Sequence, residues 1–94
     1  MKIINFKLIN GDEIIAKLVT DAEKYLIVDK PRSLQFNAQG TGAAFIPALM
    51  MSNDGEVKVY KNSISLYNEN VGSEYEKHYL QSVSGIQLAT SLNG

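Results

Sequence analysis

The stretch Ile4-Asn5-Phe6-Lys7-Leu8-Ile9-Asn10-Gly11-Asp12 decides the fold class. Apolar and polar residues alternate through Leu8, which is the period of a half-buried β-strand. Asn10-Gly11 then supplies residues that tolerate positive φ, the strongest short signal for a β-hairpin. Alternation returns after the turn, with Ile14, Ala16 and Leu18 on one face. The chain therefore opens with a predicted β-hairpin.

Alternation continues along the next two thirds of the chain. Residues 25–29 are rich in β-branched and aromatic residues and predict a third strand. Pro31 cannot donate a ladder hydrogen bond, so it marks a bend, a bulge or an edge. Residues 33–37, 56–60 and 64–67 predict further short strands. A meander of five or six strands of this size predicts a mainly β protein built as a small barrel.

The period changes after Gly72. Ser73 and Glu76 have the spacing of a helix capping box. An apolar stripe follows at helical spacing, formed by Tyr75, Tyr79, Leu80 and Val83. We expect one domain over residues 1–94, with a barrel over about 1–68, a helix over about 73–84 and a tail over 85–94.

Composition excludes several classes of protein. The 94 residues include no cysteine, so disulfides, zinc-thiolate sites and thiol nucleophiles are absent. Nine Lys and Arg against ten Asp and Glu give a net charge of −1, unlike strongly basic nucleic-acid binders. Lys7 interrupts the apolar N-terminus, and no apolar run could span a bilayer, so we expect a cytoplasmic protein without membrane contact.

No residue set predicts catalysis. His78 is the only histidine and lies in the predicted helix. The sequence contains no Gly-x-Ser-x-Gly motif, which would supply a serine nucleophile for a catalytic histidine. Gly40-Thr41-Gly42 lacks the Gly-Lys-Ser/Thr that completes a phosphate loop. We therefore expect no enzyme, no catalytic residue, no metal site and no cofactor.

Two segments resemble the motifs of the Sm-like family, whose bacterial branch is Hfq. Residues 6–11, followed by Ile14 and Leu18, resemble the first Sm motif, in which a strand ending in Asn-Gly precedes a second apolar strand. Val59-Tyr60-Lys61-Asn62-Ser63-Ile64-Ser65 resembles the second motif, which in Hfq reads Val-Tyr-Lys-His-Ala-Ile-Ser. An insertion over roughly residues 32–55 lengthens the region between the third and fourth strands.

The whole chain is similar to the Sm-like proteins of marine cyanophages. The shared features are Leu-x-x-Gly-Asp-Glu at residues 8–13, Pro31, the segment Phe45-Ile46-Pro47 and a C-terminal helix that carries tyrosines. This resemblance covers nearly all 94 residues. It implies a strongly bent, five-stranded Sm-like or SH3-like barrel with one C-terminal helix.

The resemblance also implies assembly into a homo-oligomeric ring of about five to seven subunits. In the family, the fourth strand of one subunit pairs with the fifth strand of its neighbour. Residues 56–60 and 64–67 would take these roles, with Val57, Val59, Ile64 and Leu66 turned inward. The same inward set would equally fill the core of a monomer.

Family members bind RNA around the ring pore through the loops that the two motifs form. By position, Lys61 matches the lysine of the second motif, and Asn62 replaces the histidine of Hfq. Tyr25 falls near the base-stacking position, with Lys24 beside it, and Tyr60 precedes Lys61. The alternatives are that both tyrosines pack on the sheet and that residues 61–62 are an ordinary polar turn. Leu26 stands where the family has an asparagine, so we expect the family's uridine pocket to be altered or lost.

Two functions remain open. The first is a non-catalytic ring that binds single-stranded RNA or DNA as an accessory to its processing. The second is a phage protein-interaction or assembly module that uses the barrel without nucleic acid, which the near-neutral charge favours. The apolar segment Ala43–Met51 would be a buried strand, which we favour, or the partner surface of such a module.

Overall fold

The computed structural model describes residues 2–36, 39 and 43–84, and it is mainly β with one C-terminal helix. The strands are β1 (Lys2–Leu8), β2 (Glu13–Asp21), β3 (Tyr25–Phe36), β4 (Ala43–Pro47), β5 (Glu56–Tyr60) and β6 (Ile64–Asn68). A 3-10 turn, η1 (Lys61–Ser63), joins β5 to β6, and helix α1 (Ser73–Ser82) follows. This confirms the predicted class and helix. The tail over 85–94 lies outside the described residues.

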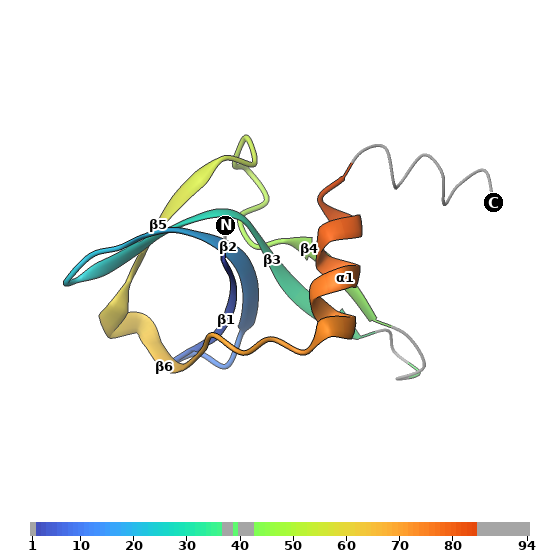
Figure 1. Ribbon diagram of the computed structural model, residues 1–94, viewed down its shortest axis with the longest axis horizontal. Coiled ribbons are helices and arrows are strands. Elements are labelled where there is room, and N and C mark those ends of the chain that lie inside the picture. Colours follow the sequence, from blue (N-terminus) through green and yellow to red (C-terminus); the bar gives the residue numbers. More distant parts are fainter. Residues whose placement is uncertain (1, 37–38, 40–42, 85–94) are drawn as a thin grey trace.

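The strands form one bent antiparallel sheet that curls into a small barrel (Figure 1). β6, β1, β2 and β3 are neighbours in that order. β3 then has two partners, because its first half pairs with β5 and its second half pairs with β4. β4 is the strand beyond the expected five, and it comes from the predicted insertion.

The opening hairpin is confirmed. β1 and β2 pair with Lys7 opposite Glu13, and Gly11 has a φ of 98°, a conformation that favours glycine. The Asn10 side-chain oxygen accepts a hydrogen bond from the Asp12 N–H at 3.0 Å. This local bond and the glycine explain why the chain reverses at this point.

β3 bends at Lys30 and Pro31 and continues as one strand, where the sequence predicted two. Lys30 has a φ of 49°, in the left-handed region. Arg32 is buried, and its guanidinium donates to both carboxylate oxygens of Asp54 at 2.8 and 3.0 Å. The Tyr79 hydroxyl donates to the Lys30 carbonyl at 2.7 Å. The bend is thus held from both the insertion and the helix.

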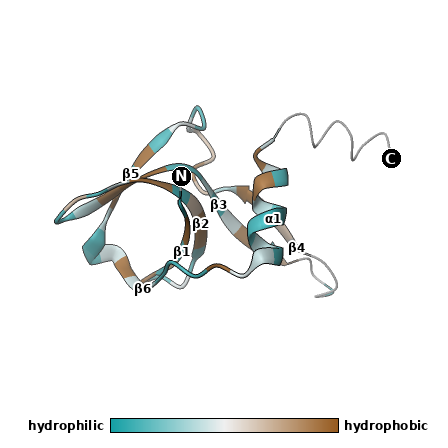
Figure 2. Cartoon of the chain, viewed as in Figure 1, coloured by the Kyte–Doolittle hydropathy of each residue, from teal (hydrophilic) through white to brown (hydrophobic). Residues whose placement is uncertain are grey.

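Two apolar clusters lie on opposite faces of the sheet. The larger fills the barrel and comprises Ile4, Phe6, Ile14, Ala16, Leu26 and Val28, with Leu8, Leu18, Ala48, Val57, Val59 and Ile64 packed around them. The smaller joins α1 to the outer face through Tyr79, Ile3 and Ile15. Figure 2 shows hydrophobic residues along β1 and β2 and hydrophilic ones at the turn between β5 and β6.

Two details of the predicted helix are wrong. Ser73 is the first helical residue and Gly72 is the N-cap, with no side-chain capping bond, so no capping box forms. Of the predicted stripe, Tyr79 is buried and Val83 packs against it, whereas Tyr75 and Leu80 are exposed. The stripe is narrower than expected because only one turn of α1 rests on the sheet.

The inward orientation predicted for Leu66 is also wrong. β6 carries a bulge, so that Ile64 pairs with Leu8 but Leu66 pairs with Lys7. The extra residue reverses the parity of the strand. Leu66 therefore points outward and is 64% exposed, while Ile64 packs on the barrel core.

The segment Ala43–Met51 was predicted to be either a buried strand or a partner surface, and its two halves differ in structure. Its first half forms β4, and Ala48 packs against the barrel core. Leu49, Met50 and Met51 lie in the following turn and are exposed. The segment is a strand followed by an exposed apolar turn.

Candidate nucleic-acid interface

Two turns that are far apart in the sequence meet at one end of the barrel. The turn between β2 and β3 is closed by a hydrogen bond from the Ala22 N–H to the Tyr25 carbonyl at 3.0 Å. The Lys61 N–H in η1 donates to the Lys24 carbonyl at 2.9 Å. The backbone thereby brings Lys24 and Tyr25 next to Tyr60, Lys61 and Asn62, so all five predicted site residues lie in adjoining segments.

The two tyrosines are direct neighbours. Tyr25 and Tyr60 are opposite each other in the β3–β5 ladder, and their rings meet edge to face with centroids 6.4 Å apart. Tyr60 is 57% exposed and Tyr25 is half-buried. Both side chains lie on the outer face of the sheet, because the neighbouring Leu26 and Val59 turn into the barrel core. They pack on each other and still leave aromatic surface open to solvent.

Lys58 contacts one ring of this tyrosine pair. Its ammonium nitrogen lies 4.5 Å from the centroid of the Tyr25 ring, a cation–π contact. Lys58 precedes Tyr60 by two residues in β5, so strand alternation places both side chains on the same face. Sequence reasoning missed Lys58, although this period-two spacing from Tyr60 would have identified it.

Lys61 has an acidic partner that the sequence analysis did not predict. Its ammonium lies 2.6 Å from a carboxylate oxygen of Asp21, at the end of β2. Both side chains are substantially exposed, so the pair contributes little to stability, about 0–1 kcal/mol. Lys24 and Asn62 are exposed, and no contact of their side chains is recorded with the described residues. The Lys61–Asp21 ion pair is therefore weak, and an anion from solution could replace the Asp21 carboxylate beside the Lys61 ammonium.

A pocket of about 340 Å³ opens beside Lys61, between β6, the end of β2 and the start of β3. Its lining residues include Asp21, Ile64 and Tyr67. The Tyr67 hydroxyl donates to Glu69 at 3.1 Å, and burial together with this carboxylate raises the pKa of Tyr67 to about 12. The phenol therefore stays neutral at physiological pH and acts as a hydrogen-bond donor.

The described residues contain no cluster of three or more His, Cys, Asp or Glu side chains placed to hold a metal ion. His78 is exposed and lies 3.6 Å from Glu74, one helical turn away. Across the described part of the chain, no helix has the length and apolar character needed to cross a membrane.

No protein-family model matches the chain, and no curated protein matches it significantly. The geometry of the barrel and of its surface therefore carries the functional argument.

Proposed function

We propose that this protein is an Sm-like, ring-forming protein that binds single-stranded RNA or DNA and has no catalytic activity of its own. The observation that carries the proposal is the Tyr25–Tyr60 pair, which is open to solvent at Tyr60, contacts Lys58 and lies beside the turn that joins two edge strands. We expect it to act in the cytoplasm of a bacterial host, as a phage-encoded accessory to RNA or DNA processing.

The free edges of the barrel support ring assembly. Within the described residues, β5 pairs with β3 alone and β6 pairs with β1 alone. Each is a five-residue strand with one unpaired edge, and such edges attract further strands. Pairing of β5 with β6 of the next subunit would cover both edges of every subunit through one repeated contact.

The aromatic and basic side chains support contact with nucleic acid. A base stacked on Tyr60 or Tyr25 would contribute about 1–3 kcal/mol. Lys61 would exchange Asp21 for a phosphate, and Lys24 and Lys58 would add positive charge near it. Repetition around a ring turns one weak site into a multivalent surface.

Fluorescence anisotropy with labelled oligo-U, oligo-A and mixed-sequence DNA tests the proposal. Lys61→Ala should weaken binding about fivefold or more, because every subunit loses a phosphate contact. Lys2→Ala is the matched control, since Lys2 is also an exposed lysine paired with a carboxylate, Glu69 at 3.2 Å. Equal effects of the two substitutions would remove Lys61 from the site, and absence of binding by the wild-type protein would refute the function.

One observation favours a second function, a protein-interaction or assembly module. The turn after β4 exposes Leu49 by 51%, Met50 by 79% and Met51 by 99%. An exposed apolar cluster of this kind is typical of a partner surface. The absorbance spectrum of freshly purified protein separates the two functions, because co-purified nucleic acid supports the first and its absence favours the second.

A further inference from the structure

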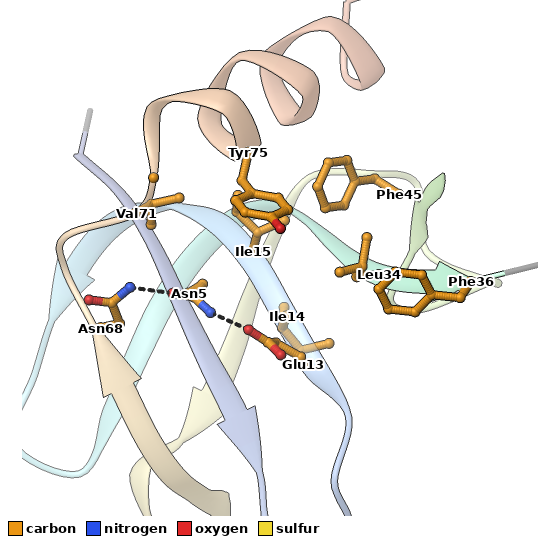
Figure 3. Close-up of a pocket in the computed structure, with 11 residues that line it drawn as sticks. Asn5, Glu13, Ile14, Ile15, Leu34, Phe36, Phe45, Asn68, Val71 and Tyr75 are labelled. Atoms are coloured by element: carbon orange, nitrogen blue, oxygen red, sulfur yellow. Dashed lines mark hydrogen bonds between the residues drawn. The ribbon is translucent and has the colours of Figure 1, made fainter. Parts of the chain in front are cut away.

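A pocket of about 450 Å³ lies on the outer face of the sheet, between the first turn of α1 and strands β1 to β4 (Figure 3). Its lining residues include neither Lys58 nor any of the five predicted site residues of the candidate nucleic-acid interface. In Figure 1, α1 and the turn between β5 and β6 lie on opposite sides of the barrel. The volume is within the range of small-molecule sites, about 300–1,000 Å³.

The pocket exists because only part of α1 rests on the sheet. Tyr79 is fully buried against Ile3 and Ile15. One turn earlier, Tyr75 lies on the same side of the helix but stays 59% exposed. The pocket is lined there by Ile15 and also by the polar residues Asn5 and Glu13, so the ring of Tyr75 is not enclosed as that of Tyr79 is.

One side of the pocket is aromatic and apolar. Figure 3 shows Tyr75 above Ile15, with Phe45, Leu34 and Phe36 on the side away from the polar residues. Phe36 is 68% exposed, which is unusual for a phenylalanine in a small domain. A planar ligand could stack on these rings and bury its apolar faces from solvent.

The other side of the pocket is a directed row of hydrogen bonds. The Asn68 amide donates to the Asn5 side-chain oxygen at 2.7 Å, and the Asn5 amide donates to Glu13 at 2.8 Å. The bond from Asn68 orients the Asn5 amide so that its nitrogen faces Glu13. The row ends on the Glu13 carboxylate, which only accepts hydrogen bonds. Among the described residues, the second carboxylate oxygen of Glu13 accepts no hydrogen bond. The row therefore presents free acceptor sites to the pocket.

We propose that this pocket binds a nucleobase whose edge carries two adjacent N–H donors, that is, guanine. Guanine N1–H and N2–H match the two oxygens of a carboxylate, as acidic side chains accept from base amino groups elsewhere. The ring would lie against Tyr75 and the neighbouring phenylalanines. Lys7 is opposite Glu13 in the β1–β2 ladder and so leaves the same face, where it supplies positive charge for the phosphate. The site requires neither a ring nor Lys61.

NMR titration of the full chain with GMP and IMP tests the site, because IMP lacks only the exocyclic amino group. GMP should shift the amide signals of the pocket residues saturably and bind about fivefold or more tightly than IMP. Glu13→Gln should reduce this GMP preference, and Tyr75→Ala should weaken both nucleotides alike. Glu74→Gln is the matched control, since Glu74 is an exposed carboxylate next to Tyr75 outside the pocket.

The same titration separates the two sources of guanine. A short oligo-U with one central G that shifts the pocket signals would identify a base within a strand, whereas a response to GMP alone would identify a free nucleotide. Equal affinity for GMP and IMP, or no saturable shift in the pocket, would overturn the proposal. Lys61→Ala should leave GMP binding unchanged, so failure of this site and failure of the nucleic-acid interface can be told apart.

Discussion

Asp54 and Arg32 form the ion pair that ties the insertion to the barrel. Arg32 is almost completely buried, and its two hydrogen bonds to the Asp54 carboxylate compensate the buried charge. The guanidinium lowers the pKa of the Asp54 carboxyl below its ordinary 3.8, chiefly through these bonds. Because the folded-state pKa is depressed, the stabilisation is present above the unfolded pKa and is lost as the pH falls through the folded one.

Asp54→Asn should therefore lower the free energy of unfolding by about 1–2 kcal/mol at neutral pH, since the carboxylate is partly exposed but the guanidinium is not. The difference from the wild type should shrink as the pH falls below the ordinary aspartate value. Urea unfolding at several pH values measures both effects. A difference independent of pH would show that the ionised carboxylate is not what matters.

Tyr79 connects α1 to the β3 bend by a single hydroxyl. It donates to the carbonyls of Lys30 at 2.7 Å and Asp29 at 3.2 Å, and burial raises the pKa of this phenol. Tyr79→Phe keeps the ring in its pocket but removes both bonds, so we expect a loss of about 1–2 kcal/mol in denaturant unfolding. Tyr75→Phe is the control, because that hydroxyl makes no recorded bond with the described residues and its ring is exposed.

At the scale of elements, the bend of β3 lets one strand serve two partners. Lys30 adopts a φ of 49°, which glycine accepts without strain and β-branched residues resist. Lys30→Gly should leave stability within about 1 kcal/mol of the wild type, whereas Lys30→Val should lower it by about 1–2 kcal/mol more. Thermal unfolding of the two variants compares them directly, and equal stabilities would contradict the left-handed conformation at this position.

The elements also show how far sequence alone could go. The Asn10-Gly11 turn and the alternation around it are local signals, and the hairpin formed as predicted. Leu66 was misplaced because one bulge residue reverses the parity that alternation assumes. The Arg32–Asp54 pair joins residues 22 positions apart, and no local pattern predicts such a contact.

The candidate site likewise has features that the sequence predicted and features that it did not. Position within the second motif predicted that Lys61 and Tyr60 would lie near Tyr25, and the structure brings these segments together. Neither the Asp21 partner of Lys61 nor the Asn68–Asn5–Glu13 row has a sequence signature, because both arise from the packing of separate strands. Long-range pairing of polar side chains therefore leaves no pattern in the sequence.

At the scale of the whole molecule, the net charge of −1 would limit the strength of the proposed nucleic-acid binding. Each chain places only Lys58 against the Tyr25–Tyr60 pair, and Lys61 in the adjoining turn is paired with Asp21. Few counterions would be released per subunit, so affinity should fall only modestly with salt. Anisotropy titrations over a range of NaCl concentrations measure this slope, and a steep dependence would point to a basic surface other than the one described.

The central claim is that the free edges of β5 and β6 close a ring. Light scattering on a sizing column at micromolar protein concentration tests it most directly. We predict a single species of about five to seven times the chain mass of 10.4 kDa. A monomer of 10.4 kDa under these conditions would contradict the ring and, with it, the multivalent nucleic-acid surface.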